Sequence, residues 1–209
     1  MQEIATDSHY KLSDAKYPII FEYVGQDTAV VKIAVNDGKA IKNDLIYGSV
    51  SGKKVDEDGN ALGGAMIGLF RTDDGEFTKE NALVTTTSAE DGSFSFENIP
   101  CGTWYVREIE QPTGFVLDDT IYPVTIGTDG QVVEIEIVNE YGRGNIHLTK
   151  VDSEYPDNKL TGAIFEVYKD SNNNGKLDDS DELLGTLTEK EIGEYGMNDL
   201  FYGRYFIKE

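Results

Sequence analysis

The feature that most constrains this chain is an internal repeat. Residues 3–18 match residues 108–123 at a constant spacing, with an acidic-apolar pair at the start and Tyr-Pro at the end of each copy. An asparagine follows each copy, at Asn43 and Asn139, and a lysine follows each asparagine at one fixed distance. Because such a period means that one structural unit recurs, the fold must accommodate the same unit more than once.

The repeat predicts three parts. Residues 48–143 form one complete module, residues 1–47 are the C-terminal half of a preceding module, and residues 144–209 are the N-terminal half of a following one. We call these the complete module, the N-terminal half-module and the C-terminal half-module. Since the cuts fall inside modules, we expect the sequence to be an excerpt of a longer array.

Short stretches of alternating apolar and polar residues, separated by Asp-Gly and similar turn signals, predict an all-β sandwich. Alternation dominates over helical periodicity except near 78–83, where a helix is the alternative. Seven strands are expected in the complete module, at 50–55, 65–71, 83–88, 93–99, 104–110, 121–126 and 132–139.

One carboxylate falls on an apolar face of this predicted sandwich. In a strand, Trp104, Val106 and Glu108 share a face. An ionised carboxylate in a core is costly, so such a group must be paired, protonated or reactive. Alternation also places Lys54 and Asn139 at the ends of inward-facing rows on the first and last strands.

If these three residues meet, they can react with one another. Burial lowers the pKa of a lysine and raises that of a glutamic acid. A neutral Lys54 could attack the side-chain carbon of Asn139 while Glu108 shuttles protons, releasing ammonia and leaving an amide cross-link. The alternative is structural: Lys54 is solvated, Glu108 accepts a backbone hydrogen bond and Asn139 caps a strand.

The motifs resemble those of Cna B-type (SpaA-like, prealbumin-like) modules of Gram-positive surface adhesins and pilins. The resemblance implies an inverse immunoglobulin-like sandwich in tandem copies, with a Lys–Asn isopeptide bond promoted by Glu. Two departures are Gly52, where an apolar residue is usual, and Lys53, which competes with Lys54. The matching motifs are Lys54-Val55-Asp56, Leu62-Gly63-Gly64-Ala65, Gly102-Thr103-Trp104-Tyr105-Val106-Arg107-Glu108, Gln111-Pro112-Thr113-Gly114-Phe115 and Val138-Asn139.

Each half-module contains two of the three residues that are equivalent to Lys54, Glu108 and Asn139. Glu3 and Asn43 belong to the preceding module, and Lys150 and Glu209 belong to the following one. They are either parts of a continuous array or partners between neighbouring chains. In the second case, donor-strand exchange between 1–47 and 144–209 would permit an intermolecular Lys150–Asn43 bond and build a fibre.

One loop of the C-terminal half-module follows the EF-hand pattern of oxygen ligands, with glycine at its sixth position. This pattern predicts calcium as a candidate bound ion, whereas the alternative is an acidic hairpin loop. No cofactor is required by the other motifs. The candidate ligands are Asp170, Asn172, Asn174, Lys176, Asp178 and Asp181.

The charge balance restricts the classes of partner that the chain can bind. With 18 basic and 39 acidic residues, the net charge of −21 disfavours nucleic acid or an anionic membrane as partner. The single Cys101 excludes an intrachain disulfide, and no apolar run suggests membrane insertion. We therefore expect a non-enzymatic stalk segment of an extracellular bacterial adhesin, pilin or fibre, attached to the cell wall or polymerised. The alternative is a module that recognises a host protein or glycan.

Overall fold

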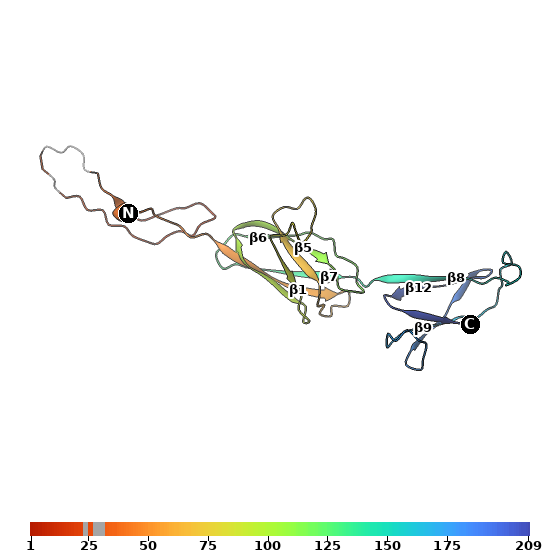
Figure 1. The fold of residues 1–209 in the computed structure, drawn as a ribbon. Coiled ribbons are helices and arrows are strands. Elements are labelled where there is room, and N and C mark those ends of the chain that lie inside the picture. Colours follow the sequence, from red (N-terminus) through yellow and green to blue (C-terminus); the bar gives the residue numbers. More distant parts are fainter. Residues whose placement is uncertain (23–24, 27–31) are drawn as a thin grey trace. The chain divides into compact units, whose positions relative to one another are not determined.

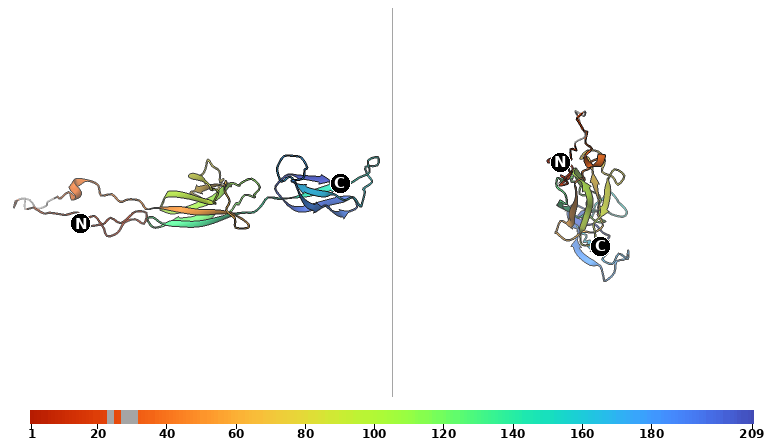
Figure 2. Two further views of the ribbon diagram at one scale, coloured as in Figure 1. Left: turned by 90° about the horizontal axis from the view of Figure 1, so that it is seen from below. Right: turned by 90° about the vertical axis from the view of Figure 1, so that its left-hand side faces the viewer.

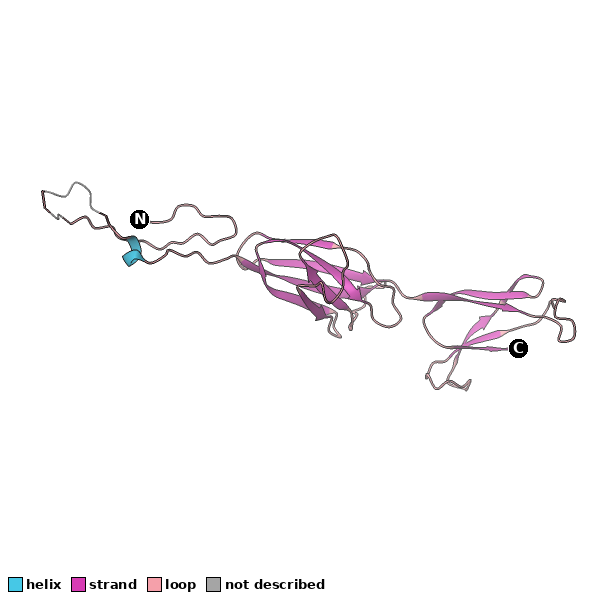
Figure 3. Ribbon diagram, turned by 45° about the horizontal axis from the view of Figure 1, so that its top comes forward, coloured by secondary structure: helices cyan, strands magenta, loops and turns pink. Residues whose placement is uncertain are grey.

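The computed structural model describes residues 1–22, 25–26 and 32–209, and its regular structure is almost entirely β (Figure 1, Figure 3). Residues 23, 24 and 27–31 of the predicted N-terminal half-module lie outside the described residues. Within the described part of the chain, the one helical segment is a 3-10 turn, η1 (Val35–Gly38). The predicted all-β class is confirmed.

The complete module contains the seven strands that the sequence predicts, with ends that differ by a few residues. Their apolar and polar residues alternate as expected, so one face of each strand turns inward. No helix forms near 78–83, where the structure has turns. The strands are β1 (Tyr47–Asp56), β2 (Met66–Phe70), β3 (Val84–Thr87), β4 (Ser93–Pro100), β5 (Gly102–Glu110), β6 (Tyr122–Ile126) and β7 (Val132–Asn139).

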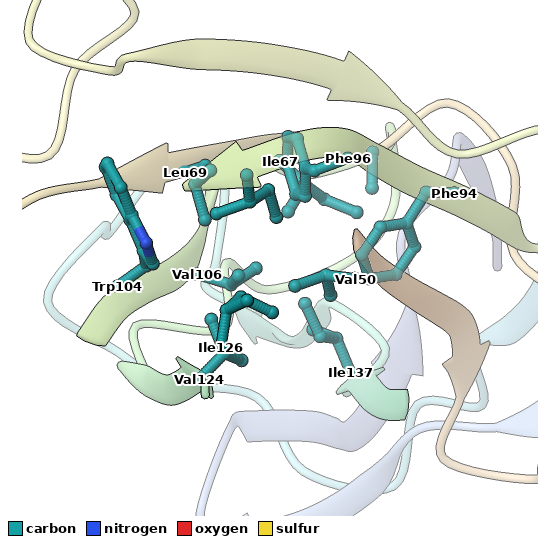
Figure 4. Packing of buried hydrophobic residues seen from close by; sticks show 12 residues of the cluster. Val50, Ile67, Leu69, Phe94, Phe96, Trp104, Val106, Val124, Ile126 and Ile137 are labelled. Atoms are coloured by element: carbon teal, nitrogen blue, oxygen red, sulfur yellow. The ribbon is translucent and has the colours of Figure 1, made fainter. Parts of the chain in front are cut away.

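These strands form two sheets that enclose one core. The first sheet has the order β4-β1-β7 and the second has the order β3-β2-β5-β6. Figure 4 shows apolar side chains from both sheets converging between them, including Trp104, Val106 and Ile137. Burial of this shared apolar surface is the main term that stabilises such a sandwich.

Strands β1 and β7 lie side by side although they are the first and last strands of the module (Figure 2). The amide of Gly130 donates to the carbonyl of Tyr47, and the amide of Ser49 donates to the carbonyl of Gln131. Further along, the Nζ atom of Lys54 donates to the carbonyl of Ile137. Because residue numbers rise together on both strands, the two strands run parallel.

Gly52 is explained by its neighbour across the sheet. It pairs with Phe94 in the antiparallel register of β1 and β4. A Cβ atom at position 52 would lie 2.0 Å from Cζ of Phe94, so the ring fills the space above the glycine. The apolar group that is usual at this position is therefore supplied by Phe94.

The C-terminal half-module forms two three-stranded sheets, with the orders β11-β12-β8 and β10-β9-β13. A smaller core packs Phe165, Val167, Leu187 and Tyr195 together. Among the described strands, β8 pairs only with β12 and so lies at an edge. The strands are β8 (Arg143–Thr149), β9 (Glu166–Lys169), β10 (Glu182–Thr186), β11 (Thr188–Glu191), β12 (Glu194–Phe201) and β13 (Tyr205–Lys208).

The chain divides into two compact units. The first comprises Met1–Val55, Ala61–Glu110 and Asp119–Ile137. The second comprises Asp56–Asn60, Gln111–Asp118 and Val138–Glu209. The boundaries of the three predicted modules stay a prediction.

A search of the described residues for helices that are both long and apolar enough to cross a bilayer found none.

Candidate functional site

The centre of the candidate site is a lysine–glutamate pair inside the first compact unit. Lys54 comes from β1 and Glu108 from β5, so the pair joins the two sheets. Both side chains are fully buried, and Nζ of Lys54 lies 3.9 Å from Oε1 of Glu108. Nζ also donates to the carbonyl of Ile137 on β7, at 3.2 Å. The predicted inward direction of Glu108 is thus what the structure shows.

Strand alternation decides between the two adjacent lysines. Lys54 has no exposed surface, whereas most of the Lys53 side chain is exposed and its Nζ donates to the carbonyl of Asp91. A solvated amine stays protonated at neutral pH and is a poor nucleophile. The burial pattern therefore favours Lys54 as the reactive candidate.

Asn139 is the last residue of β7 and is fully buried. It follows Ile137 by two residues, so the two side chains point to the same face of the strand. Its Nδ2 donates to the carbonyl of Val116 at 2.5 Å. Because a carbonyl only accepts hydrogen bonds, this contact fixes which end of the carboxamide is the nitrogen.

The N-terminal half-module brings the equivalent glutamate and asparagine together. Nδ2 of Asn43 donates to Oε1 of Glu3 at 2.8 Å and to the hydroxyl of Thr6 at 2.6 Å. The backbone amide of Ser13 donates to the other oxygen of Glu3. The hydrogen bond from Asn43, followed by that from Ser13, lowers the pKa of Glu3. The carboxylate and the carboxamide of one module are thus within direct reach of each other.

The C-terminal half-module brings the equivalent lysine and glutamate together. Nζ of Lys150 lies 2.8 Å from Oε2 of Glu209. In contrast to Lys54 and Glu108, these side chains are 32% and 52% exposed. The difference follows from the sheet order, because β1 lies between two strands whereas β8 lies at an edge of the described strands.

A family model, the SpaA prealbumin-like fold domain, matches residues 48–141 and again 144–209. The chain belongs to this family. The resemblance predicted from the Lys-Val-Asp and Gly-to-Glu motifs is therefore confirmed. No sequence among curated proteins is significantly similar to the chain.

The chain is similar to several solved structures. The Bacillus anthracis TIE protein superposes with a TM-score of 0.64 at 27% identity, covering 79% of this chain and 28% of that one. A streptococcal ancillary pilin has a TM-score of 0.44 at 24% identity, covering 99% and 63%. A variant of BcpA, the major pilin subunit of Bacillus cereus, has 0.42 at 16%, covering 77% and 57%. The chain thus spans less than two thirds of each of these relatives.

Sequence reasoning missed one polar contact of this SpaA-like chain. Asp56 is buried, and its carboxylate accepts a hydrogen bond from the Tyr141 hydroxyl at 2.7 Å. The backbone amides of Asp58 and Asn60 also donate to it. The Tyr141 hydrogen bond is the largest cause of the lowered pKa of Asp56, and the same bond raises the pKa of Tyr141 to about 12. The sequence signal that could have identified Asp56 is the aspartate that occurs in both Lys-Val-Asp motifs.

The predicted calcium loop is held by its own hydrogen bonds. The buried Asp170 carboxylate accepts from the amides of Asn174 and Gly175 and from the guanidinium of Arg204. Hydrogen bonds from Ser180 lower the pKa of Asp178 well below its usual range. Among the described residues, no group of three or more carboxylate, histidine or cysteine side chains is placed to hold a metal ion. Calcium binding, with the six predicted ligands, stays a prediction.

A melting experiment tests that prediction. An ion that binds only the folded chain stabilises it by about 2.7 kcal/mol at a hundredfold excess over its dissociation constant. We expect calcium to raise the melting temperature of chelator-treated protein. The matched control is the Asp178→Asn/Asp181→Asn variant, which lacks two oxygen anions and should not respond. Identical melting of the wild-type chain with calcium and with chelator would refute the calcium prediction.

Proposed function

We propose that the chain is a shaft or stalk segment of an extracellular bacterial pilin, adhesin or fibre, whose complete module is locked by a self-formed amide between Lys54 and Asn139. The observation that carries this proposal is the fully buried Lys54–Glu108 pair beside β7. Two charged groups are costly in an apolar core unless they are paired or reactive. Formation of a covalent bond between the first and last strands would explain why this costly pair is buried.

The proposed reaction is single-turnover and balanced. Burial of the pair disfavours both charged forms, so a proton passes from the Lys54 ammonium to the Glu108 carboxylate. The neutral Nζ then attacks Cγ of Asn139. The new Nζ–Cγ bond forms, the Cγ–Nδ2 bond breaks, and a proton transferred through Glu108 allows Nδ2 to leave as ammonia.

The half-modules support the assignment of roles. Glu3 accepts from Asn43 in one of them, and Glu209 contacts Lys150 in the other. The equivalent glutamate is therefore adjacent to the asparagine in one copy and to the lysine in the other. A group that lies between nucleophile and electrophile is suited to carry protons from one to the other.

The finer proposal concerns neighbouring chains. In the described structure β8 is an edge strand, and the Lys150–Glu209 pair beside it is partly exposed. An added strand that carries an asparagine would cover the pair, as β7 covers Lys54. A strand from residues 1–47 of a second chain, supplying Asn43, would complete the module and permit an intermolecular Lys150–Asn43 amide.

The mass of the folded chain tests the intramolecular bond. We expect the intact protein to be lighter than its sequence by one ammonia molecule, and we expect proteolysis to release one branched peptide that joins Lys54 to Asn139. If the intact mass of the completely folded protein equals the mass calculated from its sequence, the bond is refuted.

A denaturing gel tests the intermolecular bond. Wild-type protein at high concentration should give a ladder of covalent oligomers, and the Lys150→Arg variant should give none. If the ladder persists in that variant, the Lys150–Asn43 assignment is wrong. Recognition of a host protein or glycan, the alternative function, stays a prediction.

A further inference from the structure

Two short segments clamp the backbone around Asn139. The amide of Val116 donates to the carbonyl of Glu140 at 2.8 Å, and the amide of Gly142 donates to the carbonyl of Gly114 at 2.7 Å. Between these bonds, Phe115 and Tyr141 form an isolated antiparallel bridge. The segment after the glutamate strand is therefore paired with the segment that directly follows the asparagine. We call this pairing of 114–116 with 140–142 the clamp.

The same clamp recurs in the N-terminal half-module. There the amide of Lys11 donates to the carbonyl of Asp44 at 2.8 Å, and the amide of Ile46 donates to the carbonyl of His9 at 2.9 Å. The bridge between them joins Tyr10 to Leu45. Both backbone hydrogen bonds and the bridge have counterparts at the equivalent positions, although few side chains are identical. The backbone arrangement is thus a property of the module.

Side chains reinforce the clamp in the complete module. The rings of Phe115 and Tyr141 stack with centroids 5.0 Å apart. The Tyr141 hydroxyl donates to Asp56 at 2.7 Å. Tyr141 follows Asn139 by two residues, and Asp56 follows Lys54 by two residues. This hydrogen bond therefore joins the strand end next to the lysine to the segment next to the asparagine.

We propose that the clamp positions Asn139 for the cross-linking reaction, with the Val116 carbonyl as the group that receives the leaving nitrogen and Asp56 and Tyr141 as positioning residues. The inference rests on the proposed function. Asn139 Nδ2, which becomes the ammonia, already donates to this carbonyl at 2.5 Å. This contact holds the carboxamide in one orientation, so that its nitrogen faces the carbonyl.

The Val116 carbonyl has a chemical role besides orientation. After Nζ of Lys54 has added to Cγ, Nδ2 must gain a proton before the Cγ–Nδ2 bond breaks. The nitrogen then carries positive charge and three N–H donors. A fixed carbonyl dipole stabilises charge that develops in the transition state without reorganising. The carbonyl accepts a hydrogen bond from the departing nitrogen throughout and exchanges no atoms or electrons with it.

The experiment compares folding with bond formation in the same sample. Protein recovered in denaturant before the bond forms is refolded by dilution; Trp104 fluorescence reports folding, and the mass of acid-quenched samples reports ammonia loss. We expect Tyr141→Phe and Asp56→Leu to slow ammonia loss roughly tenfold after folding is complete, since small misplacements of reacting groups have large effects on rate. Asp56→Asn retains an acceptor for the hydroxyl and should keep most of the rate.

Two further variants are included, one as a second way to disturb the clamp and one as a control. Gly142→Ala places a Cβ atom 3.1 Å from the carbonyl oxygen of Gly114, so it forces the clamp open by a few tenths of an ångström. It should slow the reaction even if Tyr141→Phe does not fold. Tyr105→Phe removes a hydroxyl on the outward face of β5 and should leave the rate unchanged.

The outcomes separate the two proposals. If wild-type protein folds and never loses ammonia, the proposed function fails. If wild-type protein loses ammonia and every clamp variant that folds does so at the wild-type rate, the function stands and the clamp inference is wrong.

Discussion

Replacing Lys54 by methionine is expected to lower the melting temperature by on the order of 20 °C. A covalent bond between residues 54 and 139 closes a long loop, and by analogy with disulfides such a link stabilises the folded state by about 4 kcal/mol. A loss of that size shifts the melting temperature of a domain of this length by several degrees per kcal/mol. Methionine fills the volume of the lysine stem but cannot form the bond. Calorimetry on both proteins measures the difference.

A double variant separates the bond from electrostatics. Lys54→Met alone also removes the buried partner of Glu108, and breaking a buried pair is itself destabilising by roughly 3–5 kcal/mol. In Lys54→Met/Glu108→Leu the buried pair is replaced by apolar groups of similar volume, a change that is often neutral. We expect the double variant to remain far below the wild type in melting temperature. Wild-type melting of the double variant would show that no covalent bond stabilises the module.

Glu108→Gln is expected to fold and to retain nearly its full mass on the timescale in which the wild-type chain loses ammonia. Glutamine has the shape of glutamic acid but cannot accept a proton from Lys54 or pass one to Nδ2 of Asn139. Loss of a general acid–base group slows a reaction by about a hundredfold to ten-thousandfold. Intact mass over a refolding time course measures the rate.

Glu110→Gln is the matched control for this prediction. Glu110 lies on the same strand, two residues further on, and is exposed. The substitution changes the same charge without touching the core, so ammonia loss should proceed at the wild-type rate. Equal rates in all three proteins would remove Glu108 from the mechanism while leaving the bond itself intact.

Alternation along single strands made most of the fold and part of the site predictable. The burial of Val106 and Glu108, and the choice of Lys54 over Lys53, follow from a period of two within one strand. The repeat added Glu3 and Glu209 as equivalents of Glu108. These inferences need only local geometry, and the structure places the side chains on the faces that it predicts.

The contacts that sequence reasoning missed depend on residues far apart in the chain. Gly52 departs from the family pattern along its own strand, and only the antiparallel register shows that the ring of Phe94 lies over it. The Tyr141–Asp56 hydrogen bond joins residues from opposite ends of the module. Such pairings are set by strand order and register, which no single-strand periodicity specifies. The roles of Lys54, Glu108 and Asn139 in a reaction stay predictions until a mass is measured.

The parallel neighbours β1 and β7 have a mechanical consequence. A pull on the chain enters the complete module along β1 and leaves it along β7, so it shears the contact between these two strands. With an amide between Lys54 and Asn139, tension passes from the first strand directly into the end of the last one. Residues 55–138 then carry no load, so tension cannot unfold them and extend the chain by their length. Such a module acts as an inextensible link, and stretching would be confined to the segments between modules.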